Sequence, residues 1–250
     1  MRHFQPSRDR YRQPSRRAIL QFALPAIGGQ PQPELRYLAP PDSPIEDSSL
    51  RRFLDGLSNI VSARDYKRLE ALMLPSFRVD FDKGKGPAVF DERWAPRSHE
   101  SPVWGILSRI LELGGATYSK TLYAAPYVFA RFPVDLEPLA HVVATESDVP
   151  LRSSPAENAE AARLVTHAIL PLAHPLSPPV SLPVGGFLEV RLPDTPPSFV
   201  SSSDVYSPAG YRIFIEKRGG QWRWISLACA TLAYPPDLKK LEEKSRRSGQ

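Results

Sequence analysis

Residues 147–165, SDVPLRSSPAENAEAARLV, decide how the second half of the chain is expected to fold. Val149 and Leu151 alternate with less apolar neighbours, which is the pattern of a short strand with one buried face. The strand ends at Ser-Ser-Pro (153–155), where proline fixes the backbone of a rigid loop. The run that follows is helix-like or turn-rich. A short strand that leads at once into a proline-locked loop is typical of a small β-barrel.

The pattern of short strands continues on both sides of this stretch. Candidate strands, each bounded by Pro, Gly, Ser or Asp, are AHVVAT (140–145), VPLRS (149–153), ARLVTHAILPLA (162–173), GGFLEVRLP (185–193) and PSFVSS (197–202). Residues 209–233 then predict two strongly alternating strands around a Gly219-Gly220 turn, the clearest hairpin in the chain.

The first half of the chain is expected to contain helices. Apolar residues recur at helical spacing from Leu50 to Val61, and a second short helix is expected over Asp65–Leu74. A third is expected over residues 101–113, with Pro102 in its first turn and Gly114-Gly115 as its end. FRVDFD (77–82) predicts a strand, KGKGP (83–87) a turn, and TLYAAPYVFARFP (121–133) an extended segment.

Composition limits the class of protein. Proline, at 28 residues, is about twice as frequent as the usual 5% or so, which favours short strands and rigid loops over long helices. The net charge of +5 resides in residues 1–17, which hold six arginines and one aspartate, so the rest of the chain is neutral. A basic arm on a neutral body is not the pattern of a nucleic-acid-binding fold. The single cysteine, Cys229, excludes an intrachain disulfide and is expected to be a buried, inert thiol.

The N-terminal segment has the pattern of an export signal. SRRAILQFALPAIGG (15–29) places two arginines before a weakly apolar run that is too short for a membrane span. Ser15–Leu20 resembles the twin-arginine (Tat) signal, with Arg16 and Arg17 as the arginine pair, which implies export of the folded protein to the periplasm or another extracytoplasmic space. The alternative is a disordered basic arm on a cytoplasmic protein. No transmembrane segment is expected.

Residues 141–165 resemble the start of a bacterial SH3-like (SH3b) domain, in which a strand ending in Val-x-Val/Leu-Arg is followed by a Ser-x-Pro loop. Val149, Leu151, Arg152, Ser154 and Pro155 occupy those positions. The chain departs from the family where a Trp is common, since Phe187 stands there, and where a Gly-Trp-Val strand follows, since Ser-Phe-Val (198–200) stands there.

Two flanking segments carry a second resemblance. The helical start, FLDGLSNIVSARDYKRLEALM, and the closing hairpin, YRIFIEKRGGQWRWISLA, resemble the ends of a cone-shaped α+β unit of the nuclear-transport-factor-2-like (NTF2-like) kind. The whole chain also resembles exported bacterial SH3-domain proteins of unknown function that carry Ala-Pro-Tyr-Val and Ser-Pro-x-x-Tyr-Arg segments, here Ala125–Val128 and Ser207–Arg212.

The sequence indicates no catalytic or metal centre. The five histidines have no metal-ligand spacing, and His141 and His167 are expected to be hydrogen-bonded barrel residues. DFDKGKGP (80–87) lacks the ligands of a calcium loop and is expected to be a hairpin turn. Nothing selects an acid/base pair among the acidic side chains near it, Asp80, Asp82, Asp91, Glu92 and Glu100. We therefore expect no cofactor and no enzymatic activity.

The candidate ligand-binding residues belong to the predicted barrel. They are Phe187, Phe199 and Tyr206, which can stack on an extended peptide or glycan, and Arg152, which can meet an acidic group. The alternative is that these aromatic residues are core. Trp222 and Trp224 share one face of the last strand and are expected to pack on the helices.

The expected fold class is α+β, with an N-terminal helical segment and a C-terminal β-hairpin flanking a small SH3-like β-barrel. The expected parts are a signal peptide or disordered basic arm (1–33), a linker (34–49), a helical α+β segment (50–138), the SH3-like barrel (139–206), a β-hairpin packing on the α+β segment (207–234) and a disordered tail (235–250). The expected function is that of a non-catalytic exported binding or scaffold protein that recognises cell-wall peptide or an envelope protein. The alternative is a small-molecule-binding or hydrolytic enzyme with an NTF2-like cavity.

Overall fold

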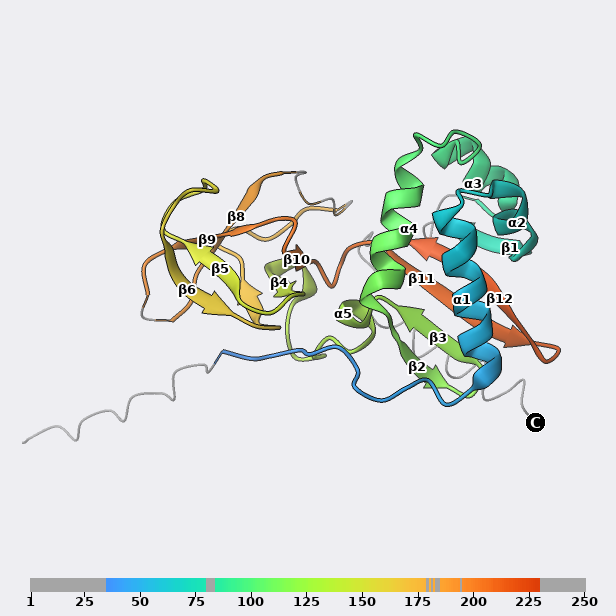
Figure 1. Cartoon of the computed structure of the whole chain (residues 1–250), viewed down its shortest axis with the longest axis horizontal. Helices are drawn as coiled ribbons and strands as arrows, with labels where there is room; N and C mark the ends of the chain where they lie inside the picture. The colour runs from blue at the N-terminus through green and yellow to red at the C-terminus, as the bar shows by residue number, and fades with distance from the viewer. Residues whose placement is uncertain are drawn as a thin grey trace, which may run out of the picture. The chain divides into compact units, whose positions relative to one another are not determined.

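The two alternating strands near the C-terminus lie in the middle of a five-stranded sheet in the computed structural model (Figure 1). The model describes residues 35–79, 84–178, 180, 182, 185–193 and 195–229. The strand order is β1-β12-β11-β3-β2, with β1 parallel to β12 and the other pairs antiparallel. The strands are β1 (Met73–Val79), β2 (Ala116–Ser119), β3 (Leu122–Ala125), β11 (Arg212–Arg218) and β12 (Gln221–Ala228).

Five helices belong to the same part of the chain, and α1 and α4 lie side by side over one face of the sheet (Figure 1). The helix expected from Pro102 is confirmed, with Ser101 as its N-cap and Gly114 as its C-cap. α1 is capped by Asp47 and α2 by Asp65. The helices are α1 (Ser48–Ser62), α2 (Tyr66–Ala71), α3 (Pro87–Trp94), α4 (Pro102–Leu113) and α5 (Tyr127–Ala130).

Two of these helices were not expected from the sequence. α3 begins at Pro87, where only a turn was predicted, and its burial comes from Phe90 and Trp94. α5 interrupts the segment predicted to be extended over 121–133, because Pro126 follows β3 without an N–H to donate and the next three residues are buried. The predicted strand over 77–82 is confirmed as far as Val79, and residues 80–83 lie outside the described residues.

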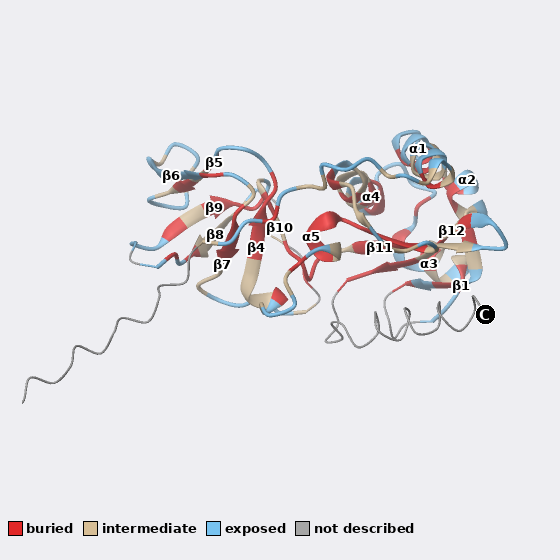
Figure 2. Ribbon diagram, turned by 90° about the horizontal axis from the view of Figure 1, so that it is seen from below, coloured by how far each residue is buried: buried red, intermediate tan, exposed pale blue. Residues whose placement is uncertain are grey.

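Aromatic side chains fill the space between the helices and the five-stranded sheet. Phe77 and Trp224 meet edge to face with ring centroids 4.7 Å apart, and Phe90 stands 5.5 Å from Trp224. Trp104 from α4 joins the same core cluster. Trp222 and Trp224 are buried against the helices as predicted, and Figure 2 shows the burial of this core along the sheet.

Residues 141–206 contain two smaller sheets around a separate apolar core. A three-stranded sheet has the order β10-β4-β7, and a four-stranded sheet has the order β6-β5-β9-β8. Val142, Leu151, Leu170 and Val200 are fully buried in the core that the two sheets share. The strands are β4 (His141–Ala144), β5 (Val149–Arg152), β6 (Ala161–Val165), β7 (Ile169–Pro171), β8 (Phe187–Val190), β9 (Ser198–Ser201) and β10 (Val205–Tyr206), preceded by the short 3-10 helix η1 (Pro138–Ala140).

Neither of these sheets closes into a barrel among the residues that the structure describes. The bridge between Leu172 and Val190 connects one sheet to the other. The segment 162–173, predicted to be one strand, is divided between β6 and β7, with His167 at a positive φ of 52° between them. Pro171 ends β7 because it has no N–H for a ladder. The molecule is therefore a mixed α+β protein with several open sheets.

The first described residues are attached to the three-stranded sheet. Tyr37 forms a bridge with Ala168, the N–H of Leu38 donates to the carbonyl of His167 (2.7 Å), and the N–H of Ile169 donates to the carbonyl of Arg36 (2.8 Å). Leu38 is 8% exposed and packs in a cluster with residues of α5 and β4. Residues 35–38, which we call the strap, thus belong to the fold, although residues 34–49 were expected to be a linker.

Candidate binding surfaces

Three of the four predicted ligand-binding residues lie on the outer face of the four-stranded sheet. Leu151, Val190 and Val200 point into the core, so the alternation of a strand turns Arg152, Phe187 and Phe199 to the opposite side. All three are intermediate in exposure. They are therefore neither fully buried core nor freely exposed. We call this surface, defined by Arg152, Phe187 and Phe199, the outer face.

The register of the strands determines which side chains are neighbours on the outer face. Phe199 is directly opposite Arg152 on one side and Glu189 on the other. Phe187 is opposite Ser201, one pleat further along. Residues directly opposite in an antiparallel pair have Cβ atoms about 5 Å apart, so an aromatic ring stands between a cation and an anion.

The guanidinium of Arg152 is held in place by the loop that follows its strand. Nη1 donates to the carbonyl of Ala159 (2.9 Å), and Nη2 lies 3.7 Å from a carboxylate oxygen of Glu157. The Arg152 side chain is 19% exposed, whereas that of Glu157 is 73% exposed. The distance to Glu157 exceeds that of a strong charge-assisted hydrogen bond, about 2.7–2.9 Å. An acidic ligand group could thus replace this solvated carboxylate.

Tyr206, the fourth predicted residue, lies away from the outer face. It belongs to β10 in the three-stranded sheet, opposite Val143. Its hydroxyl donates to the carbonyl of Tyr211 (2.6 Å), and desolvation by burial raises the pKa of this hydroxyl. The sequence grouped Tyr206 with the barrel aromatics, but the structure gives it a different environment.

That environment is a pocket of about 570 Å³, which we call the α4 pocket. One wall is the face of α4 between Pro102 and Arg109, and the other contains the segment from Ser202 to Tyr211. Most of the lining surface is apolar. The residues used below are Pro102, Gly105, Ile106, Arg109, Tyr206 and Tyr211.

Arg109 is the one cationic side chain among the described lining residues of the α4 pocket. Its Nη2 donates to the hydroxyl of Thr145 (2.7 Å). Its Nη1 lies 3.5 Å from Glu146 and 3.9 Å from Glu112, and both carboxylates are more than half exposed. Sequence reasoning missed Arg109, whose position in the middle of a helix gives no local signal of a ligand.

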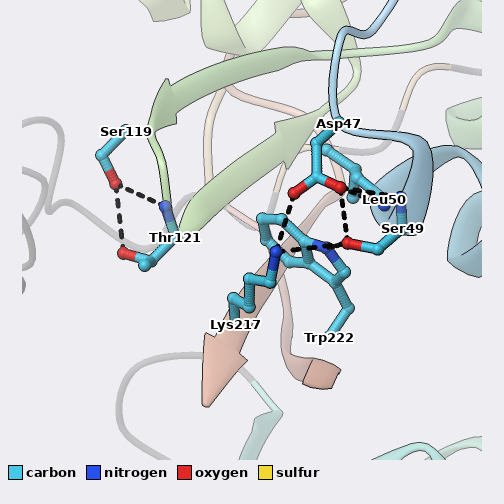
Figure 3. Close-up of polar contacts among 7 residues, drawn as sticks. All are labelled: Asp47, Ser49, Leu50, Ser119, Thr121, Lys217 and Trp222. Carbon is cyan, nitrogen blue, oxygen red and sulfur yellow. Dashed lines mark hydrogen bonds and ion pairs between the residues drawn. The ribbon is translucent and has the colours of Figure 1, made fainter. Parts of the chain in front are cut away.

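A polar cluster joins the start of α1 to the C-terminal hairpin (Figure 3). Lys217 Nζ donates to a carboxylate oxygen of Asp47 (2.9 Å) and to the hydroxyl of Ser49 (3.2 Å). Trp222 Nε1 donates to the same hydroxyl (3.0 Å), and that hydroxyl donates to Asp47. Hydrogen bonds from Ser49 and Lys217 hold the pKa of Asp47 well below its usual value. Every member thus stabilises the cap of α1.

Among the residues that the structure describes, the remaining titratable groups form no metal cluster and no activated thiol. No group of three His, Cys, Asp or Glu side chains able to hold a metal ion occurs in the described part of the chain. Cys229 is buried, as predicted, and its thiol donates to the carbonyl of Val180 (3.2 Å). Nδ1 of His141 contacts the carbonyl of Glu137 (2.8 Å), whereas the buried Nδ1 of His167 has no hydrogen-bond partner within the described residues.

Asp91 and Glu92 lie on α3, while Asp80 and Asp82 lie outside the described residues. Arg16 and Arg17 of the predicted export signal also lie outside them. Of the helices that the structure describes, none has the length and apolar character needed to cross a membrane.

Comparisons with known proteins give little further information. No family model matches the chain, and no curated protein matches it. One solved structure is similar, an NTF2-like protein with a cystatin-like fold from Novosphingobium aromaticivorans, with 10% identity and a TM-score of 0.27 over 77% of this chain and 86% of that chain. A likeness this weak does not establish a shared fold, so the NTF2-like and SH3-like relationships stay predictions.

Proposed function

We propose that the protein is a non-catalytic, exported binding protein, and that residues 139–206 are an SH3-like module whose outer face recognises cell-wall peptide. The observation that carries this proposal is the row in which Arg152 stands directly beside Phe199 on a surface that is only half-buried. An arginine next to an aromatic ring offers two bonds to a carboxylate and an apolar surface for the chain that bears it.

The chemistry of a cell-wall peptide fits this pair. Such peptides are short, extended and rich in carboxylates, and they have small apolar side chains. Arg152 would bind a carboxylate in place of solvated Glu157, and Phe199 and Phe187 would contact the adjacent methyl groups. An envelope protein with an acidic extended segment would present the same groups, and the sedimentation test below separates it from cell-wall peptide.

The alternative function, an enzyme or small-molecule binder with an NTF2-like cavity, requires open space between the helices and the five-stranded sheet. Phe77, Phe90 and Trp224 fill part of that space with mutual edge-to-face contacts. A pocket of about 630 Å³ lies between the start of α1 and the sheet, and Leu50, Lys217 and Trp222 are among its lining residues. The aromatic packing counts against the alternative, which also needs a polar pair that converges in an apolar cavity.

The direct test is co-sedimentation of the full chain with purified cell-wall sacculi. We expect saturable binding, weakened at least tenfold in Arg152→Ala and in Phe199→Ala, and weakened less in Arg152→Lys, which keeps the charge. Matched controls are Arg218→Ala, which removes an exposed arginine from β11 of the five-stranded sheet, and Tyr37→Ala, which removes a 60% exposed aromatic ring from the strap.

Thermal melting of each variant would establish that it is folded. Binding that is unchanged in both outer-face variants would refute the proposed site. A chain that does not bind sacculi but is recovered with an acidic envelope peptide in an Arg152-dependent manner would assign the same face to a protein partner instead.

Export is a separate part of the proposal and rests on Arg16 and Arg17. The double change to lysine keeps the charge of the arm but removes the arginine pair. We expect loss of export in this variant, as measured by cell fractionation. Unchanged export would refute the twin-arginine signal and favour the cytoplasmic alternative.

A further inference from the structure

We propose that the α4 pocket is a binding site for a small apolar molecule that bears one carboxylate, and that Arg109 binds the carboxylate. This inference is independent of the proposed function, because the pocket shares none of the residues of the outer face. Its volume of about 570 Å³ is within the range of small-molecule sites, about 300–1,000 Å³.

The lining of the pocket determines the chemical class of the ligand. Ile106, Tyr206 and Tyr211 provide apolar surface, and the hydroxyl of Tyr206 is already bonded to the carbonyl of Tyr211. Ser202, Ser203 and Ser207 also line the pocket, but most of the lining surface is apolar, so the walls favour hydrocarbon or aromatic groups over the more polar sugars and nucleotides. One cation among the lining residues matches one negative charge.

The present contacts of Arg109 leave it able to bind a carboxylate. Thr145 holds Nη2 at 2.7 Å and so orients the guanidinium. The carboxylates of Glu146 and Glu112, at 3.5 and 3.9 Å, are beyond the distance of strong charge-assisted hydrogen bonds, about 2.7–2.9 Å, and both are well solvated. A ligand carboxylate in a mostly apolar pocket would lose little to these competitors and would form shorter bonds.

Gly105 is a second feature that points to this site. It lies in the middle of α4, on the same helical face as Pro102, Ile106 and Arg109, and it lines the pocket. A Cβ atom added there would meet nothing within 4 Å, so no protein neighbour requires a glycine. Glycine within a helix costs about 0.5–1 kcal/mol relative to alanine. Because glycine has no side chain, this position of α4 leaves the space of the pocket open.

The same residue supplies a precise test. Gly105→Phe places a large ring on a wall of the pocket at a position where an added Cβ meets no atom within 4 Å, and it replaces the poorest helix former other than proline. Gly56→Phe is the matched control, because Gly56 is a helical glycine in α1 that also has nothing within 4 Å and does not line the pocket. Both variants are expected to remain folded, which thermal melting checks.

The experiment is isothermal titration calorimetry of the full chain with dodecanoate, kept below its micelle concentration, and with dodecyltrimethylammonium as the probe of opposite charge. We expect saturable one-site binding of dodecanoate and much weaker binding of the cation. Gly105→Phe should weaken dodecanoate binding at least tenfold, and Gly56→Phe should leave it unchanged. Arg109→Gln should weaken it about tenfold or more, and Arg109→Lys should restore part of the loss.

The proposal is overturned if the wild-type chain does not bind dodecanoate saturably, if both probes bind equally, or if Gly105→Phe binds dodecanoate as well as the Gly56→Phe control. Sacculus binding by Gly105→Phe is expected to be unchanged. A failure of the α4 pocket is therefore distinguishable from a failure of the outer face.

Discussion

Replacement of Leu38 by alanine tests whether the strap is an integral part of the fold. Leu38 is 8% exposed, and it packs with Tyr127, Val128 and Val143, which are all fully buried. Its removal loses the transfer free energy of the buried side chain and leaves a cavity that rigid neighbours cannot close. Buried Leu→Ala changes cost about 2–5 kcal/mol, and the residual exposure of Leu38 favours the lower half of that range.

We therefore expect the free energy of unfolding to fall by about 3 kcal/mol, a factor of more than about 100 in the unfolding equilibrium. The corresponding fall in melting temperature is about 6–12 °C for a chain of this size. Urea unfolding, followed by tryptophan fluorescence, measures the change. Tyr37→Ala is the control, since Tyr37 is its neighbour in the strap and is 60% exposed.

A loss of less than about 0.5 kcal/mol in Leu38→Ala, or an equal loss in both variants, would refute the reasoning. Either result would mean that the strap contributes backbone pairing alone or nothing at all. A large loss in Leu38→Ala with a small one in Tyr37→Ala would mean that the apolar contact fixes the strap.

Two further predictions concern the larger sheet and its cap. Gly115→Ala should destabilise the protein strongly, because an added Cβ would lie 2.1 Å from the carbonyl oxygen of Ala124, whereas Gly56→Ala, in open space, should stabilise it by about 0.5–1 kcal/mol. Urea unfolding of both variants measures the contrast, and a mild effect at Gly115 would contradict the close approach of Gly115 to β3. The folded-state pKa of Asp47 is lowered, so its carboxylate stabilises the fold above the unfolded pKa of about 3.9, and this contribution is lost as pH falls through the folded pKa. The melting temperature of the wild type should therefore fall more on acidification than that of Asp47→Asn. Parallel curves of melting temperature against pH would contradict the hydrogen bonds from Ser49 and Lys217 to Asp47.

Periodicity and capping predicted α1, α2, α4 and the C-terminal hairpin, because in these segments local preference and tertiary packing agree. α1 has an aspartate cap and a regular apolar face, and α4 begins with Ser-Pro and ends at glycine. The hairpin turns at two glycines, both with positive φ. α3 and α5 were missed because their sequences have no cap of that kind, and tertiary burial of Phe90 and Tyr127 decides their conformation.

The candidate sites were predicted only in part, because strand alternation is a local property whereas strand pairing is a tertiary one. Alternation within a strand can assign Arg152, Phe187 and Phe199 to one side of a sheet, since that depends on local geometry alone. It cannot say that β10 pairs with β4 and separates Tyr206 from them, because the pairing of distant strands is a tertiary property. No local pattern predicts the α4 pocket, since residues about 100 positions apart in the sequence form its two walls.

The central position of β11 and β12 has a consequence for how the protein is made. β1 pairs with β12, and Met73 lies opposite Trp224, so the larger sheet needs residues that are synthesised about 150 positions apart. Until residues 212–228 leave the ribosome, α1 and α4 have only the β2–β3 hairpin, and not the complete sheet, on which to bury Leu50, Leu57 and Leu107. The sheet must then assemble after most of the chain is already made, and contacts of such long sequence separation form slowly. During synthesis the nascent chain therefore exposes apolar helices, the kind of surface that chaperones bind.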